Sequence, residues 1–385
     1  MRGFWPGLLT LCGLLITYGS LYPFHFVAPP SGAAAWSEFI SNVELWTSIG
    51  DMIGNVLLFV PFGALIVAAL PREKRGVARL CASAVLSIVF AFAIQAFQIY
   101  FPPRAPALAD VFWNGAGTVI GIGVALALAT RAGDSPWQAD RVPVILVLVW
   151  IVTQWWPFVP TLDWQGIKDS LKPLLLHPDF HLQHALLTTV RTFIVGCLFG
   201  AMTPYAGRNA RRFAALLCIV LAGKVLTVGQ VIDVSTLSGY VAGFAIWFAT
   251  RSARRAQLRA GLVVLFVAYT VSALTPLEIR GAPSEFHWMP FQAMLEGSME
   301  INSMALLESS LVYAALLWLV DQMGGRVRDA SFALALWVGC LECAQMWIDG
   351  RTADITPVLL ALAAGEIIHW LSAPSAPAAR RRARA

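Results

Sequence analysis

The chain has 385 residues, of which 58% are hydrophobic and only 13% charged, and its formal net charge is +5. This composition excludes an ordinary soluble domain, because apolar runs of about 20 residues, long enough to cross a bilayer, recur along the whole chain. The positive charge does not indicate nucleic-acid binding. The basic residues lie in short clusters between the apolar runs, where they orient membrane helices.

The apolar runs predict an all-α, polytopic membrane protein of about twelve transmembrane helices. The start of the chain resembles a secretory signal, but residues 18–30 (YGSLYPFHFVAPP) separate its apolar run from any cleavage site by too great a distance, so we expect a retained first helix. The predicted runs are 8–27, 52–70, 80–101, 110–129, 143–160, 184–203, 213–231, 234–250, 261–277, 303–320, 330–348 and 354–371.

Basic residues alternate from loop to loop. Of the Lys and Arg residues, 20 fall in one alternate set of loops and termini and 5 fall in the opposite set. Because cytoplasmic loops carry the basic excess, we expect both termini in the cytoplasm and the chain in the cell inner (plasma) membrane. The basic tail, residues 373–385, should be disordered and attracted to anionic lipid.

The predicted helices group into three quasi-repeats of four helices, covering residues 1–131, 141–250 and 260–372. Each unit opens with a helix that runs to a proline near its outer end. Residues 350–356 (GRTADIT) also align without a gap on residues 229–235 (GQVIDVS).

Two pairs in the first unit share one spacing, Asp51-x-x-x-Asn55 and Asp110-x-x-x-Asn114. At i, i+4 both members of a pair face the same way on a helix. Both pairs begin at the outer ends of helices that run inward, so we expect them to meet near the external surface. Capping of the helix N-termini is an alternative role, but it accounts for the aspartates alone.

The third helix and the following turn add polar groups at the same depth. Gln95 and Gln98 stand at i, i+3, and Arg104 lies in the turn. Together with the Asp/Asn pairs they predict an outward-facing polar pocket, in which Arg104 would contact an anion, because its guanidinium suits phosphate or carboxylate geometry. Gly117 and Gly121 continue the Asp110/Asn114 face, and their spacing would let another helix come close.

The third unit offers Glu342, Gln345, Arg351 and Asp354 as further ligand-binding candidates. Glu342 is an ionisable group inside an apolar run, and Arg351 or Asp354 is its expected partner. A purely structural ion pair is the alternative. Arg351 would be a second anion contact.

The second unit is the poorest in such residues. It has Arg191, Lys224, Gln230 and Asp233 but no acidic group matching that of the third unit. We therefore expect it to have kept the scaffold and lost the site.

An external loop has histidines at 177, 181 and 184 near Asp179, a spacing that could hold a metal. Pro178 interrupts any helix there, and interfacial histidines are common, so no metal site is predicted. Neither a phosphate-binding loop, nor a dinucleotide fingerprint, nor a nucleophile elbow is present, so no cofactor is predicted. The six cysteines lie in or beside apolar runs, which argues against disulfides.

At these motifs the chain resembles the VanZ-like family of bacterial membrane proteins. The resemblance lies in DMIGNVLLFVPFG, residues 51–63, and QAFQIYFPPRAPALADVFWNGAG, residues 95–117. The family shows an Asp-x-x-x-Asn helix with Pro-x-Gly, then Glu/Gln-x-x-Gln, a turn arginine, and Asp-x-x-x-Asn-x-x-Gly. Those places are occupied here by Asp51, Asn55, Pro61, Gly63, Gln95, Gln98, Arg104, Asp110, Asn114 and Gly117.

The resemblance is good over about 50–125 and fainter over 330–365. Gln95 replaces the commoner Glu, and the third unit has Val358 where the pattern has Asn. The family is named for resistance to teicoplanin, a glycopeptide, and has no established biochemical activity. The resemblance implies an integral membrane protein linked to the cell envelope, and no reaction.

The leading functional expectation is binding, with or without movement or modification, of a polar or anionic envelope component such as a membrane lipid or cell-wall precursor. A rival expectation is a membrane-embedded hydrolase or transferase that uses Glu342 or Asp110 as general base. A proton-coupled transporter and a non-catalytic assembly scaffold are two further candidates. Oligomeric state is not predicted.

Overall fold

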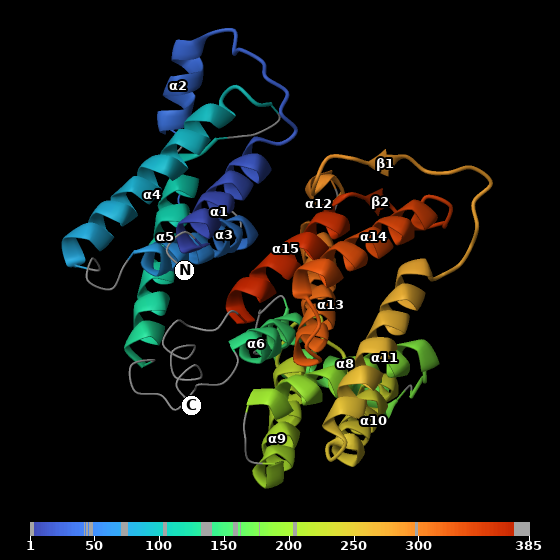
Figure 1. Cartoon of the computed structure of the whole chain (residues 1–385). Coiled ribbons are helices and arrows are strands. Elements are labelled where there is room, and N and C mark those ends of the chain that lie inside the picture. Colours follow the sequence, from blue (N-terminus) through green and yellow to red (C-terminus); the bar gives the residue numbers. More distant parts are fainter. Residues whose placement is uncertain are drawn as a thin grey trace. The chain divides into compact units, whose positions relative to one another are not determined.

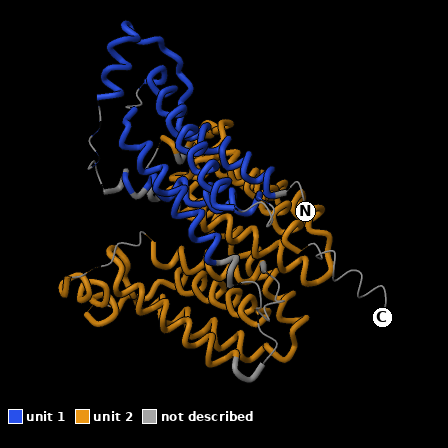
Figure 2. Tube along the Cα trace, turned by 90° about the vertical axis from the view of Figure 1, so that its left-hand side faces the viewer, with its two compact units in different colours: residues 1–138 blue, residues 139–385 orange. Residues whose placement is uncertain are grey.

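A computed structural model describes residues 4–41, 43, 45, 49–70, 76–102, 106–131, 141–156, 161, 163–176, 178–202, 206–296 and 299–372. The chain divides into two compact units, Met1–Gln138 and Ala139–Ala385, which Figure 2 distinguishes by colour. Arg104, His177 and the tail 373–385, all used in the sequence predictions, lie outside the described residues.

Helices build the first unit (Figure 1). A small apolar core of Ile16, Phe59, Ala91, Ile94 and Val111 joins four of them. The helices are α1 (Phe4–Leu21), α2 (Gly32–Ser41), α3 (Ile49–Ala69), α4 (Val77–Gln98) and α5 (Leu108–Arg131).

Helices α3 and α5 are in close backbone contact at two glycines of α5. A Cβ atom added at Gly117 would collide with the carbonyl oxygen of Val56, and one added at Gly121 would collide with that of Val60. The predicted close approach at these two glycines is therefore confirmed. It aligns the N-terminal halves of α3 and α5, which carry Asn55 and Asp110.

The second unit has a larger core, in which Tyr313, Trp318, Phe213 and Leu198 are almost fully buried. Its helices are α6 (Arg141–Trp155), α7 (Trp164–Leu175), α8 (Leu182–Met202), α9 (Ala206–Val225), α10 (Val234–Thr250), α11 (Arg254–Leu274), α12 (Gln292–Glu296), α13 (Met299–Gln322), α14 (Val327–Gln345) and α15 (Thr356–Ser372).

A short parallel pair of strands ties the loop after α11 to the turn between α14 and α15 (Figure 1). Strand β1 (Phe286–His287) pairs with β2 (Ala353–Asp354). The backbone N–H of Asp349 also donates to the carbonyl of Glu278 over 2.7 Å. These bonds fix the backbone beside Asp354, a predicted site residue.

The predicted all-α architecture is confirmed, and the short strands β1 and β2 are an addition to it. Every predicted apolar run overlaps a helix, although several helices end earlier than predicted, among them α1 at Leu21, α6 at Trp155, α9 at Val225 and α11 at Leu274. For α1 and α11 the cause is the proline two residues on, Pro23 or Pro276, which has no N–H to continue the helix. The short helices α2, α7 and α12 were not predicted.

Within the described residues, 5 helices are long and apolar enough to cross a membrane. Shorter apolar helices accompany them, so the chain has the helices of a multi-pass membrane protein. The five span Val77–Gln98, Leu108–Ala127, Leu182–Met202, Arg254–Leu274 and Met304–Gln322.

Candidate functional site

In the first unit three predicted side chains meet at Asp110. Its Oδ1 accepts a hydrogen bond from Asn55 Nδ2 over 2.7 Å, and its Oδ2 accepts one from Gln95 Nε2 over 3.2 Å. Asn55 comes from α3, Gln95 from α4 and Asp110 from the first turn of α5. The carboxylate is thus held in one orientation by two neutral amides.

Gln95 has a second role, because its Oε1 accepts a hydrogen bond from the backbone N–H of Ala107 over 3.2 Å. Gln98, one turn on, donates to the carbonyl of Ser20 over 2.9 Å and ties α4 to the last turn of α1. Gln98 therefore joins two helices, while Gln95 positions Asp110 and the start of α5.

Asn114 lies one turn after Asp110 on α5 and is 5% exposed. Its Oδ1 is buried, and among the described residues no donor lies within hydrogen-bond distance of it. A buried carbonyl oxygen without a partner costs about 1–3 kcal/mol. Asn114 thus offers an acceptor next to the fixed carboxylate.

Two predicted members of the first site cannot be placed at the level of side chains. Arg104 lies outside the described residues. Asp51 belongs to α3, but its side chain is not among those described. Their contribution to a pocket stays a prediction.

In the second unit, Glu342 and Asp354 come together with 4% and 7% exposure. Glu342 Oε2 accepts a hydrogen bond from the backbone N–H of Asp354 over 2.9 Å. Asp354 Oδ1 in turn accepts from the backbone N–H of Thr356 over 2.6 Å and from the Thr356 hydroxyl. Asp354 therefore binds the first turn of α15, and the expected pairing of Glu342 with Asp354 is made through the backbone.

Gln345 and Arg351 both bind the end of α11. Gln345 Nε2 donates to the carbonyl of Ala273 over 3.1 Å. Arg351 donates from Nε to the carbonyl of Thr275 over 2.8 Å and from Nη2 to that of Ser272 over 2.6 Å. These bonds place a cation at the C-terminus of a helix, where the helix dipole favours it.

Two hydrogen bonds of the first unit recur in the second. The bond from Gln98 to the Ser20 carbonyl corresponds to that from Gln345 to the Ala273 carbonyl. Both Gln95 and Glu342 accept from a backbone N–H that lies 12 residues later in the chain.

The α6–α10 region has related contacts with other side chains. Lys224 Nζ donates to Gln154 Oε1 over 3.2 Å, and Gln230 Nε2 donates to the carbonyl of Trp156 over 2.7 Å. Asp233 caps α10 by accepting from the backbone N–H of Thr236 over 2.7 Å. Lys224 therefore occupies the position that corresponds to Gln345, and Gln230 the position that corresponds to Arg351.

In the first turn of α8, His184 Nδ1 lies 3.3 Å from Asp233 Oδ2. Burial alone would raise the pKa of Asp233, but hydrogen bonds from Thr236 and the neighbouring His184 lower it. Asp179, His181 and His184 border a pocket there. Within the described part of the chain, no three such residues lie close enough to hold a metal ion.

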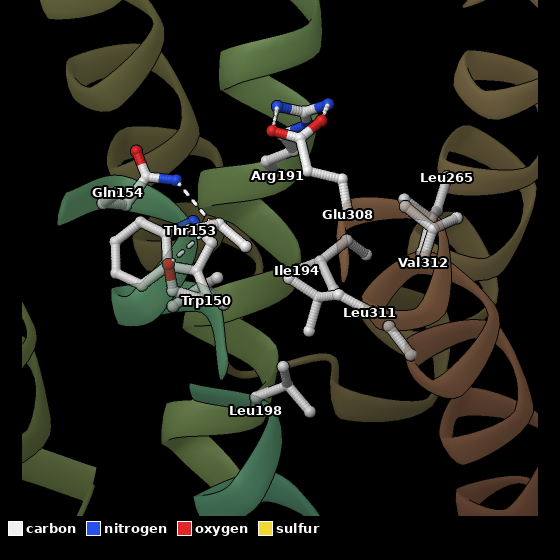
Figure 3. A pocket seen from close by; sticks show the side chains of 12 residues that line it. Trp150, Thr153, Gln154, Arg191, Ile194, Leu198, Leu265, Glu308, Leu311 and Val312 are labelled. Atoms are coloured by element: carbon white, nitrogen blue, oxygen red, sulfur yellow. Dashed lines mark hydrogen bonds and ion pairs between the residues drawn. The ribbon is translucent and has the colours of Figure 1, made fainter. Parts of the chain in front are cut away.

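Glu308 is a polar residue that the sequence analysis missed. Its carboxylate forms a two-point ion pair with Arg191, joining α13 to α8 (Figure 3). A glutamate in the middle of the predicted run 303–320 is the signal that could have indicated it.

The comparisons with known proteins agree with the geometry of the first unit. Residues 11–129, just under a third of the chain, match the family model described as VanZ/LLP1. No curated protein and no solved structure matches the chain. The family match covers Asn55, Gln95 and Asp110, which meet in the first unit, and Asn114 one turn further along α5. It confirms the VanZ-like resemblance predicted from their motifs.

Proposed function

We propose that this protein is a multi-pass membrane protein of the bacterial cell envelope that binds a polar envelope component at the outer end of α5. The supporting observation is the pairing of a fixed carboxylate, Asp110, with the buried, unpartnered Oδ1 of Asn114 one turn away. Both groups accept hydrogen bonds, so they suit the hydroxyl or ammonium groups of a ligand.

Arg104 supplies the complementary chemistry in this proposal. In the sequence it lies six residues before Asp110, between the residues of α4 and those of α5. An arginine can hold phosphate or carboxylate oxygens at two points. The ligand class that suits all three residues carries both hydroxyl or ammonium groups and an anionic group, as a lipid head group or cell-wall precursor does.

The proposal includes an arrangement of the whole chain. Three quasi-repeats of four helices, with both termini in the cytoplasm of a bacterial inner membrane, would put the start of α5 at the outer surface. The recurrence of the Gln98–Ser20 bond as Gln345–Ala273 supports the repeat, and the excess of basic residues in alternate loops supports the orientation.

The proposal is tested by measuring which envelope components stay bound to the full-length protein on gentle extraction, using native mass spectrometry. Asp110→Asn keeps the shape of the side chain but removes its charge, and Asn114→Leu removes the acceptor. Both variants should lose the bound component that the wild type retains. Asp233→Asn is the matched control, because Asp233 also stands at the start of a helix but serves as its cap.

Equal retention in the wild type, Asp110→Asn and Asn114→Leu would contradict binding at α5 and favour a scaffold. Protein abundance and the thermal unfolding midpoint are measured alongside. A lost helix cap can cost about 0.5–2 kcal/mol and lower the amount of folded protein without any effect on binding.

A further inference from the structure

The ion pair of the second unit lies far from helix ends. Arg191 stands midway along α8, and Glu308 lies inside the candidate membrane span Met304–Gln322. Arg191 Nη1 donates to Glu308 Oε1 over 3.2 Å, and Nη2 donates to Oε2 over 2.7 Å. Charged groups inside membrane-spanning helices are expensive and usually serve a function.

This ion pair leaves hydrogen-bonding capacity unused. A guanidinium has five N–H donors, and Glu308 is the one partner of Arg191 among the described residues. The two side chains keep 41% and 32% of their surface exposed. Surrounding hydrocarbon could not satisfy these donors, so a polar group should cover them.

A second basic residue, Lys224, is linked to the ion pair through Gln154. Lys224 Nζ donates to Gln154 Oε1, and the Tyr240 hydroxyl donates to the same atom over 2.9 Å. Gln154 borders the cavity that Arg191 and Glu308 line. Within the described residues Gln154 is the one hydrogen-bond partner of the ammonium group, so Lys224 also has donors to spare.

Apart from Thr153 and Gln154, the remaining walls of the cavity are apolar. Figure 3 shows the ion pair at one end, with Ile194 and Leu198 of α8, Leu311 of α13 and Trp150 of α6 around the space beside it. The cavity is partly open, and its space of about 30 Å³ is enough for one water-sized group but too small for a phosphate. A larger ligand would therefore lie at the open side, where Arg191 and Glu308 are exposed. Spare cationic donors on otherwise apolar helices suit an amphiphile better than a free ion.

We propose that Arg191, Glu308 and Lys224 form a second binding site, which holds the phosphate group of an anionic membrane lipid. The phosphate oxygens accept the spare N–H donors of Arg191 and Lys224. The acyl chains lie outside the cavity, along the exposed surface of α8 and α13. The site uses none of the residues at α5 and does not depend on the function proposed there.

The test titrates the purified full-length protein, in a neutral detergent, with phosphatidylglycerol and measures binding by native mass spectrometry. Two further probes separate the sources of affinity: diacylglycerol has the chains without the phosphate, and inorganic phosphate has the anion without the chains. Phosphatidylglycerol should bind at least tenfold more tightly than either. Equal affinity for inorganic phosphate would overturn a lipid site.

Variants locate the binding. Lys224→Gln and the double variant Arg191→Gln/Glu308→Gln should each weaken phosphatidylglycerol binding about tenfold or more, and the double variant leaves no unpaired charge. The matched control is Arg328→Gln/Glu366→Gln, which removes another two-point ion pair, with bonds of 2.9 and 3.0 Å, away from the cavity. The basic tail is identical in all variants.

Thermal unfolding establishes that each variant is folded before binding is compared. If the double variant fails to fold, Lys224→Gln carries the test, because glutamine already stands at the corresponding positions 98 and 345. Affinities for phosphatidylglycerol that are the same in Lys224→Gln and the wild type would overturn the proposal.

Discussion

The backbone N–H of Asp354 donates a hydrogen bond to Oε2 of Glu342 over 2.9 Å. In the first unit the corresponding acceptor is the neutral amide oxygen of Gln95, which binds the N–H of Ala107. One backbone contact is therefore built once with a carboxylate and once with an amide, and this difference can be tested by exchanging the two side chains.

The free energy of unfolding of Glu342→Gln should be within about 1 kcal/mol of that of the wild type. The glutamine oxygen can still accept from the Asp354 N–H, and the glutamine amide can donate, as that of Gln95 does to Asp110. Glu342→Ala leaves the buried Asp354 N–H unpartnered and should cost about 1–3 kcal/mol. Thermal unfolding in detergent measures both. Equal losses would mean that the charge of Glu342 itself is required.

Arg351→Gln should destabilise the second unit by about 1–3 kcal/mol, because it removes two hydrogen bonds from a charged donor to the carbonyls of Ser272 and Thr275. The thermal unfolding midpoint is the measurement. Arg326→Gln is the control, since that side chain is 88% exposed and pairs only weakly with Asp329 at 3.8 Å. An unchanged thermal unfolding midpoint in Arg351→Gln would show that water replaces these hydrogen bonds without loss of stability.

Gly117→Ala and Gly121→Ala should each destabilise the first unit by about 1–3 kcal/mol, because the new methyl group meets backbone of α3. Gly123→Ala, on the same helix, has nothing within 4 Å of its added Cβ. It should be neutral or slightly stabilising, since alanine favours helix. Thermal unfolding of the three variants checks the contact, and a neutral Gly117→Ala would contradict it.

Reporter fusions test the predicted orientation of the chain. Fusions after Pro30, Gly166 and Ala282 should read as extracytoplasmic, and those after Glu73, Arg208 and Arg326 as cytoplasmic. The expectation follows from the 20 basic residues on one side and the 5 on the other. A cytoplasmic signal from any fusion of the first set would break the twelve-helix topology.

Arg104→Lys keeps the positive charge of the predicted anion contact but loses the two-point geometry of the guanidinium. Retention of the envelope component by the purified protein should fall about tenfold or more, since that geometry supplies part of the binding energy. Arg326→Lys, a change of the same kind at an exposed position, should retain it fully. Undiminished retention in Arg104→Lys would remove Arg104 from the site.

The helices and the polar cluster at the start of α5 could be predicted because their signals are local. Apolar runs identify membrane helices, and polar residues inside those runs stand out at fixed spacings, as Asn55, Gln95 and Asp110 do. Their meeting at one point followed from helix direction alone. The close approach of α3 and α5 could be predicted for the same reason, from the spacing of Gly117 and Gly121.

The remaining contacts could not be predicted, because their partners cannot be identified from the sequence. Gln98, Gln345 and Arg351 bind backbone carbonyls, and every residue has a carbonyl, so no side-chain pattern points to these roles. Arg191 and Glu308 are 117 residues apart, and their pairing depends on how α8 packs against α13. Such a partner is found only when the helices have been placed.

The backbone contact between α3 and α5 also limits how the first unit can move. Where glycine lies directly on the carbonyls of Val56 and Val60, no side chain stands between the helices to change rotamer and absorb a shift. The two helices should therefore move as one rigid body. A ligand that displaces Asp110 would carry Asn55 with it, and the motion would be taken up where this pair meets α1 and α4.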